Sequence, residues 1–120
     1  MATVQETVQH YLQIWNQRDA AARRAGVRSV FSEACTYTDP MAAVTGHDGI
    51  DGFIAAVQQQ FAGVRFELAG AVDAHHDTAR FTWHARAEGR PEPLAIGFDV
   101  VVLDGERIKH VLGFLDKAPG

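Results

Sequence analysis

Asp39 and Pro40 end the stretch CTYTDP, and an aspartate at this place can serve two purposes. Pro40 disfavours a helical conformation at the residue before it and has no N–H to donate, so we expect a short strand over 35–38 to stop here. Asp39 is then a turn residue. An aspartate at the end of a strand can also act as a general acid or base at the mouth of a pocket. The local sequence supports both interpretations.

The dipeptide Asp104-Gly105 is a strong signal for a tight β-hairpin, and it predicts which side chains face one another in the last two strands. With these two residues as the loop, Asp99 pairs with His110 on a face that is otherwise apolar. A carboxylate and an imidazole buried together are tolerable as a hydrogen-bonded pair. Such a pair can tune a histidine for proton transfer. The alternative is a purely structural pair, and a one-residue β-bulge would undo the pairing altogether.

Tyr11 falls on the apolar stripe of the first predicted helix, so its hydroxyl should point inward. The Tyr11 hydroxyl either faces a pocket or bonds to a backbone group of the core. Trp83 alternates inward along its strand and is a core residue, a pocket wall, or both. The side chains that we expect to line a water-excluding pocket are Phe53, Phe61, Trp83, Leu112 and Phe114.

Other chemistries lack support in the sequence. There is no glycine-rich phosphate-binding motif, no HExxH and no GxSxG, so we expect no cofactor. His75 and His76 fall in a predicted hairpin turn, and no carboxylate–histidine set with ligand spacing accompanies them. We therefore expect no metal site. Cys35 lies in a strand and is expected to pack rather than to react.

Hydrophobic periodicity places helices first and strands afterwards. Helical spacing predicts a helix from Thr3, a second one capped by Asp19, and a third one capped by Asp48. Alternating or continuously apolar runs at 64–72, 79–87, 94–103 and 107–116 predict strands. We expect an α+β fold in which the helices pack on one face of a curved, mostly antiparallel sheet and close a cone around a pocket.

Composition limits the classes of partner. The 120 residues should form a single domain, 1–120, and the net charge of −4 without a basic stripe argues against nucleic-acid binding. No apolar run is long enough for a membrane span. The N-terminus lacks the features of a signal peptide, so a cytoplasmic location is the default expectation.

The order of elements resembles the NTF2-like superfamily, which includes ketosteroid isomerase and the SnoaL-type polyketide cyclases. The stretches that carry the resemblance are YLQIWNQRD, YTDP followed by GHDGIDGFI, and GFDVVVLDGERIKHVLGFLD. The resemblance covers nearly the whole chain. It implies the cone-shaped fold, with three N-terminal helices on a strongly curved sheet.

The resemblance to ketosteroid isomerase assigns roles to three residues. It implies that Tyr11 donates to an oxyanion, that Asp39 is the general base, and that Asp99 is a second, protonated donor. Phe31 and Ile54 stand where the isomerase has supporting tyrosines. His110 opposite Asp99 is instead similar to the SnoaL cyclases, in which an aspartate acts with a pocket histidine.

Two functions follow from these observations. The first is an acid–base enzyme for a small hydrophobic carbonyl compound, which it would isomerise or cyclise by an aldol reaction. The alternative is a non-catalytic protein that binds a small ligand or acts as an accessory dimer. A homodimer is expected on resemblance, and also because the outward sheet face around Ile96, Phe98, Val100 and Val102 is too apolar to leave in water.

Overall fold

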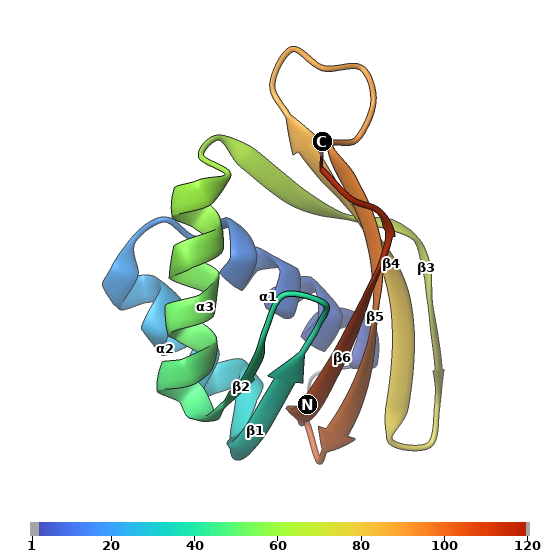
Figure 1. Ribbon diagram of the computed structural model, residues 1–120. Coiled ribbons are helices and arrows are strands. Elements are labelled where there is room, and N and C mark those ends of the chain that lie inside the picture. The colour runs from blue at the N-terminus through green and yellow to red at the C-terminus, as the bar shows by residue number, and fades with distance from the viewer. Residues whose placement is uncertain (1–2, 120) are drawn as a thin grey trace.

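The computed structural model describes residues 3–119 and has three helices on one face of a curved, six-stranded sheet that does not close into a barrel (Figure 1). The sheet order is β2-β1-β6-β5-β4-β3, and every neighbouring pair is antiparallel except β1 and β6. The α+β class is confirmed. The elements are α1 (Val4–Asn16), α2 (Ala20–Val30), β1 (Phe31–Thr38), β2 (Ala43–Thr45), α3 (Gly46–Gln60), β3 (Val64–His75), β4 (Thr78–Ala87), β5 (Ala95–Asp104) and β6 (Arg107–Lys117).

Local side-chain contacts explain where the helices begin. Thr3 and Glu6 form the expected capping box at the start of α1, with reciprocal bonds of 3.0 and 3.1 Å. Asp19 caps α2 by accepting from the N–H of Ala22 at 2.8 Å. The cap predicted at Asp48 is wrong, because α3 begins at Gly46 with Thr45 before it. Asp48 lies in the first turn instead, where its charge favours the helix dipole.

Two features of the first strands differ from the prediction. β1 begins at Phe31, which directly follows α2 and is fully buried, rather than at Cys35. The expected loop at 41–47 contains β2, whose three residues pair with the end of β1. Three residues are too few for an alternating pattern to be recognised.

The β5–β6 hairpin has a different register from the predicted one. Its two-residue turn is Gly105-Glu106, so Asp104 pairs with Arg107. Lys109 then forms a one-residue bulge, because the register shifts between Val102 and Leu103 on the opposite strand. A shift of one residue moves every later side chain to the other face. The resulting partners are Leu103–Ile108, Val102–His110, Val101–Val111 and Asp99–Gly113.

The new register corrects three expectations about β6. His110 does not pair with Asp99; it lies on the outer face and is 2.7 Å from the hydroxyl of Thr36. Leu112 and Phe114 also point outward, with 42% and 51% of their surface exposed. Phe114 stacks on Phe98 of β5 at a ring-centroid distance of 5.0 Å.

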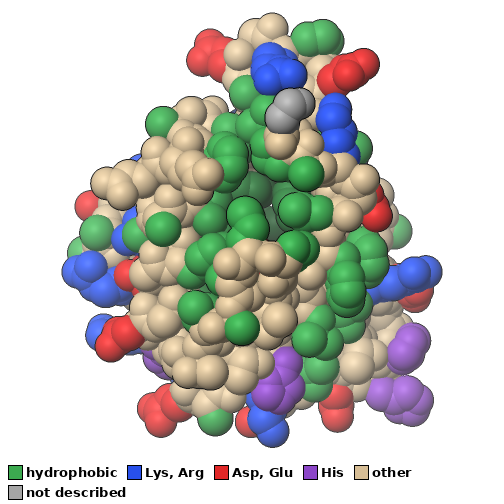
Figure 2. Space-filling view, in the orientation of Figure 1, with side chains coloured by type: hydrophobic (Ala, Val, Ile, Leu, Met, Phe, Trp, Pro, Cys, Tyr) green, Lys and Arg blue, Asp and Glu red, His purple; other side chains and the backbone are tan. Residues whose placement is uncertain are grey.

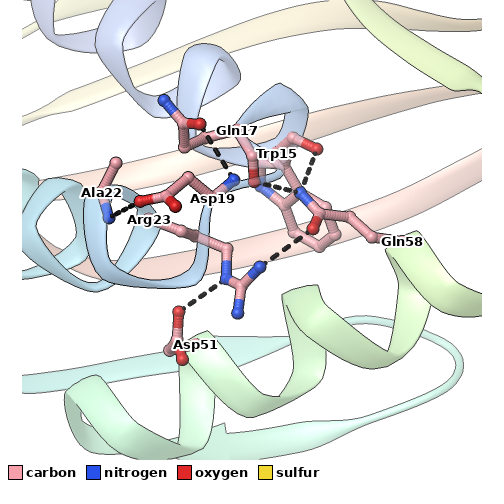
Figure 3. A network of polar contacts seen from close by, with 7 residues as sticks. All are labelled: Trp15, Gln17, Asp19, Ala22, Arg23, Asp51 and Gln58. Carbon is pink, nitrogen blue, oxygen red and sulfur yellow. Dashed lines mark hydrogen bonds and ion pairs between the residues drawn. The ribbon is translucent and has the colours of Figure 1, made fainter.

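Polar contacts inside the helical layer fix the end of α1 (Figure 3). The amide of Gln58 on α3 donates to the carbonyls of Trp15 and Gln17 at 2.9 and 2.8 Å. The guanidinium of Arg23 on α2 donates to Gln58 at 3.0 Å and to Asp51 at 2.8 Å. Because these groups are largely buried, their mutual pairing holds all three helices in one arrangement. No helix within residues 3–119 has both the length and the apolar character needed to cross a membrane.

Candidate active site

A small cavity lies between the helices and the concave face of the sheet and opens to solvent. Figure 2 shows a recess ringed by hydrophobic side chains on this face. Its volume is about 60 Å³, which is well below the roughly 300–1,000 Å³ of typical ligand pockets. The lining residues are Tyr11, Leu12, Trp15, Tyr37, Asp39, Met41, Phe53, Val57, Phe66, Trp83, Asp99 and Leu115.

Asp99 is the most deeply buried carboxylate of the cavity. It lies on the inward face of β5 and is only 3% exposed. The hydroxyl of Tyr11 donates to its Oδ2 at 2.8 Å, and Nε1 of Trp83 donates to its Oδ1 at 3.2 Å. Burial raises the pKa of Asp99 to about 6; the two hydrogen bonds oppose this rise, and the charge of Asp39 adds to it. Asp99 can therefore exchange a proton near neutral pH.

Asp39 is held at the end of β1 by a tight turn. The N–H groups of Met41 and Ala42 donate to its Oδ1 at 2.8 and 2.9 Å. The hydroxyl of Tyr37 donates to its Oδ2 at 2.7 Å. Asp39 is thus a turn residue and a pocket residue at once, because the turn that Pro40 enforces aims the carboxylate at the cavity.

The side chains of Asp39 and Asp99 both lie against Gly113 of β6. A Cβ on this glycine would stand 3.0 Å from Oδ1 of Asp99 and 3.2 Å from Cβ of Asp39. Both separations are shorter than ordinary van der Waals contact. Glycine at this position leaves the space in which the two acids approach each other, which explains why they interact electrostatically.

The two tyrosines that bond to these acids remain protonated. Burial raises the pKa of Tyr11 well above its ordinary value, and the negative charge of Asp99 raises it further. Burial and the charges of Asp99 and Asp39 raise the pKa of Tyr37 in the same direction. Both phenols are therefore hydrogen-bond donors rather than bases.

Trp15 forms the central wall of the aromatic lining. Its ring lies 5.5 Å from that of Phe66, 5.7 Å from that of Tyr37 and 6.0 Å from that of Phe53, measured between centroids. Its indole N–H is buried and makes no hydrogen bond to any described residue. The indole is still close enough to Tyr11 to counteract part of the rise in the pKa of that phenol.

The structure places the predicted site residues in two groups. Tyr11, Asp39, Asp99, Phe53 and Trp83 all line the cavity. The other four predicted positions lie elsewhere: His110, Leu112 and Phe114 are on the outer face, and Phe61 packs against the core at the end of α3 without lining the cavity.

Several lining residues were not predicted. Tyr37 stands two residues before Asp39 on β1, so strand alternation alone puts both on one face, and this signal could have found it. Phe66 alternates inward on β3 in the same way. Leu115 pairs with Gly97 and faces inward in place of its neighbour Phe114, because the bulge at Lys109 exchanges the two faces of β6.

Comparison with known proteins identifies the family. A family model described as the SnoaL-like domain matches residues 8–111, which is most of the chain. This chain belongs to the SnoaL-like family. The matched segment contains every residue of the cavity except Leu115. No curated protein matches the chain at a significant level.

Solved structures agree with this assignment. A proposed isomerase of the SnoaL-like family from Agrobacterium tumefaciens is 40% identical, with a TM-score of 0.87 over 92% of this chain and 94% of that one. A protein with a ketosteroid isomerase-like fold from Catenulispora acidiphila, solved with trimethylamine, is 20% identical, with a TM-score of 0.73 over 92% and 85%. A proposed polyketide cyclase from Sinorhizobium meliloti is 16% identical, with a TM-score of 0.71 over 89% and 92%. The last two likenesses show the shared NTF2-like fold alone.

Proposed function

We propose that this SnoaL-like protein is an acid–base enzyme that acts on a small, mostly apolar carbonyl compound. One observation carries the proposal: Asp39 and Asp99 approach each other across Gly113 at the end of an otherwise apolar cavity, with the Tyr11 hydroxyl bonded to Asp99. A pair of acids with different surroundings can divide the roles of base and proton donor between them.

The roles follow from what surrounds each acid. The oxygens of Asp39 accept three hydrogen bonds, which hold its carboxylate in place at the cavity, and we assign it as the base that removes a proton alpha to the carbonyl. The C–H electron pair then moves to the carbonyl oxygen and forms an enolate. Asp99 in its protonated form donates a hydrogen bond to that oxyanion, and Tyr11 donates a second one when its hydroxyl turns from Oδ2 of Asp99 to the substrate.

The fate of the enolate decides the reaction. Return of the proton from Asp39 to a different carbon isomerises the substrate. Attack of the enolate carbon on a second carbonyl of the same molecule gives aldol cyclisation, and the oxygen of that carbonyl takes up the proton held by Asp39. Both reactions use the same residues. A cavity of about 60 Å³ limits the part of the substrate that enters it to a small group, unless the exposed Met41 at its mouth moves aside.

Exchange of alpha protons tests the proposal without a known substrate. A panel of small cyclic and unsaturated ketones is incubated with the protein in deuterated buffer, and loss of the alpha-proton signal is followed by NMR. We expect Asp39→Asn and Asp99→Asn to slow the exchange by about 100-fold or more. Asp116→Asn, which changes an exposed acid near the end of β6, is the matched control. Undiminished exchange in both cavity variants would refute the proposal.

Non-catalytic binding of a small ligand is the second candidate function. The cavity is small and hydrophobic, and the related Catenulispora acidiphila protein was solved with trimethylamine. If no ketone in the panel exchanges its protons, while small molecules bind in the cavity, this function is favoured instead.

We also propose that two copies associate through the outer sheet face. Figure 2 shows hydrophobic side chains along the course of β6. The apolar side chains of this face are Ile96, Phe98, Val100, Val102, Leu112 and Phe114. A second copy would cover this surface with an equivalent one, as a twofold interface requires.

A further inference from the structure

The cavity carries negative charge without a positive partner. Its lining includes two carboxylates and no lysine, arginine or histidine. The ion pairs among residues 3–119 all lie elsewhere in the molecule, and none includes Asp39 or Asp99. A buried carboxylate without a cation is costly, so a positively charged ligand would supply the missing partner.

Aromatic rings form most of the remaining wall. Six lining residues are aromatic, and they lie on five different elements of the fold. Neighbouring rings meet at steep angles, such as 85° between Trp15 and Phe53 and 70° between Phe66 and Trp83, so they surround the space rather than stack on one side of it. Rings of this kind attract organic cations through their electron-rich faces.

The hydrogen bonds that Asp39 and Asp99 already accept limit which kind of cation could bind in the cavity. Both oxygens of Asp99 accept a bond, and those of Asp39 accept three between them. About three of the roughly eight lone-pair sites on the two carboxylates remain, which is fewer than a hard metal ion needs and no more than a primary ammonium would use. A tertiary or quaternary alkylammonium needs few such contacts, because its surface is mostly methyl groups that pack against aromatic rings.

We infer that this cavity binds small alkylammonium ions, which Asp39 and Asp99 attract by charge and the aromatic walls enclose. The inference rests on the proposed function in one respect: both place their ligand in the same cavity. The cation occupies the site when both acids are ionised, whereas the proposed reaction uses protonated Asp99. A small alkylammonium ion is therefore expected to compete with a carbonyl ligand.

Binding can be read directly at the two tryptophans of the chain, Trp15 and Trp83, which both line the cavity. Each gives one indole N–H signal in a nitrogen-15 NMR spectrum. The full chain is titrated at neutral pH and constant ionic strength with tetramethylammonium chloride. Parallel titrations use tert-butanol, which is neutral and has the same number of non-hydrogen atoms, and sodium pivalate, which carries a negative charge.

We expect saturable shifts of both indole signals with tetramethylammonium at concentrations about tenfold or more below those that tert-butanol requires, and none with pivalate. Asp99→Asn should weaken cation binding by about tenfold or more and leave the affinity for tert-butanol nearly unchanged. Asp116→Asn is the charge-matched control outside the cavity. Unfolding curves of each variant separate loss of binding from loss of fold.

The outcomes distinguish this inference from the proposed function. Equal or tighter binding of tert-butanol would show that the cavity recognises shape rather than charge, and would overturn the inference. If the cation does not bind but ketones exchange their protons, the inference fails and the proposed function stands. If the cation binds and no ketone exchanges its alpha protons, the inference stands and the proposed enzymatic function fails. Failure of both experiments would overturn both.

Discussion

The indole ring of Trp83 lies against the backbone of Gly97, in the space that a side chain on Gly97 would occupy. The two residues are direct partners on β4 and β5. A Cβ on Gly97 would stand 2.3 Å from Cζ2 of Trp83. The absence of a side chain lets the ring cross the strand and reach Asp99, which lies two residues further along β5. Gly97 is therefore a positioning residue for the hydrogen bond between Trp83 and Asp99.

Gly97→Ala should displace the Trp83 ring and break this bond. The new methyl group would also meet the carbonyl oxygen of Phe114 at 2.7 Å, so we expect a loss of about 1–3 kcal/mol in the free energy of unfolding. Loss of a donor to the carboxylate should raise the pKa of Asp99 further. Chemical denaturation and the shift of the Trp83 indole signal measure the two effects.

Gly52→Ala is the matched control for Gly97→Ala. Gly52 lies exposed within α3, and a Cβ there would meet no atom within 4 Å. Alanine should stabilise the helix by about 0.5–1 kcal/mol. An unmoved Trp83 signal in Gly97→Ala would contradict the positioning role.

Gly113→Ala should push Asp99 and Asp39 apart. Its Cβ would stand 3.0 Å from the Asp99 carboxylate, so one of the two acids must move. We expect the proposed proton exchange to slow by about 100-fold, which is the scale of an acid–base contribution. Binding of tert-butanol to the Gly113→Ala variant checks that the substitution leaves the cavity intact. Full activity in this variant would show that the close approach of the two acids is not needed.

Asp99→Asn should change how stability depends on pH. The pKa of Asp99 is raised from 3.8 to about 6 on folding, so the native state binds more protons than the unfolded state between these values. The contribution of Asp99 to the free energy of unfolding is therefore largest below pH 3.8 and is lost as pH rises toward 6.

At about 1.4 kcal/mol per pKa unit, this loss amounts to about 3 kcal/mol. Asparagine cannot ionise, so the variant should gain about that much relative to the wild type between pH 4 and pH 7. Urea unfolding at several pH values measures the difference. A constant difference across this range would show that burial does not perturb Asp99.

Phe114→Lys should weaken self-association if two copies meet through the outer sheet face. Phe114 is 51% exposed and stacks on Phe98 at the centre of this face. A charge there cannot be buried without a partner. Met41→Lys is a suitable control, because Met41 is 58% exposed but lies at the cavity mouth. Analytical ultracentrifugation should show a dimer for the wild type and Met41→Lys and a monomer for Phe114→Lys. An unchanged dimer in Phe114→Lys would exclude this interface.

Patterns with a local physical cause predicted much of the fold. The capping box at Thr3, the cap at Asp19 and the break at Pro40 depend on neighbours in the sequence, and all three are found as expected. Helical spacing predicted that Tyr11 points inward, and the assumed hairpin register put Asp99 on an apolar, inward face; both residues line the cavity.

The register of β6 could not be predicted in the same way. The bulge at Lys109 has no distinctive sequence signal, and its single extra residue turned His110, Leu112 and Phe114 to the outer face. Gly113 and Leu115 face inward for the same reason. Local turn chemistry thus indicated a hairpin near Asp104, while the pairing of the strands depended on packing of the whole sheet.

The most direct test of the acid–base site is an NMR titration of the Asp99 side-chain carboxyl carbon in the wild type and in Asp39→Asn. The two carboxylates interact, and burial dominates the shift at Asp99. We predict a pKa of about 6 in the wild type and a lower pKa in Asp39→Asn, because the neighbouring negative charge has been removed. An ordinary pKa near 3.8 in the wild type, or an identical value in both proteins, would contradict the claim that Asp39 and Asp99 form one coupled site.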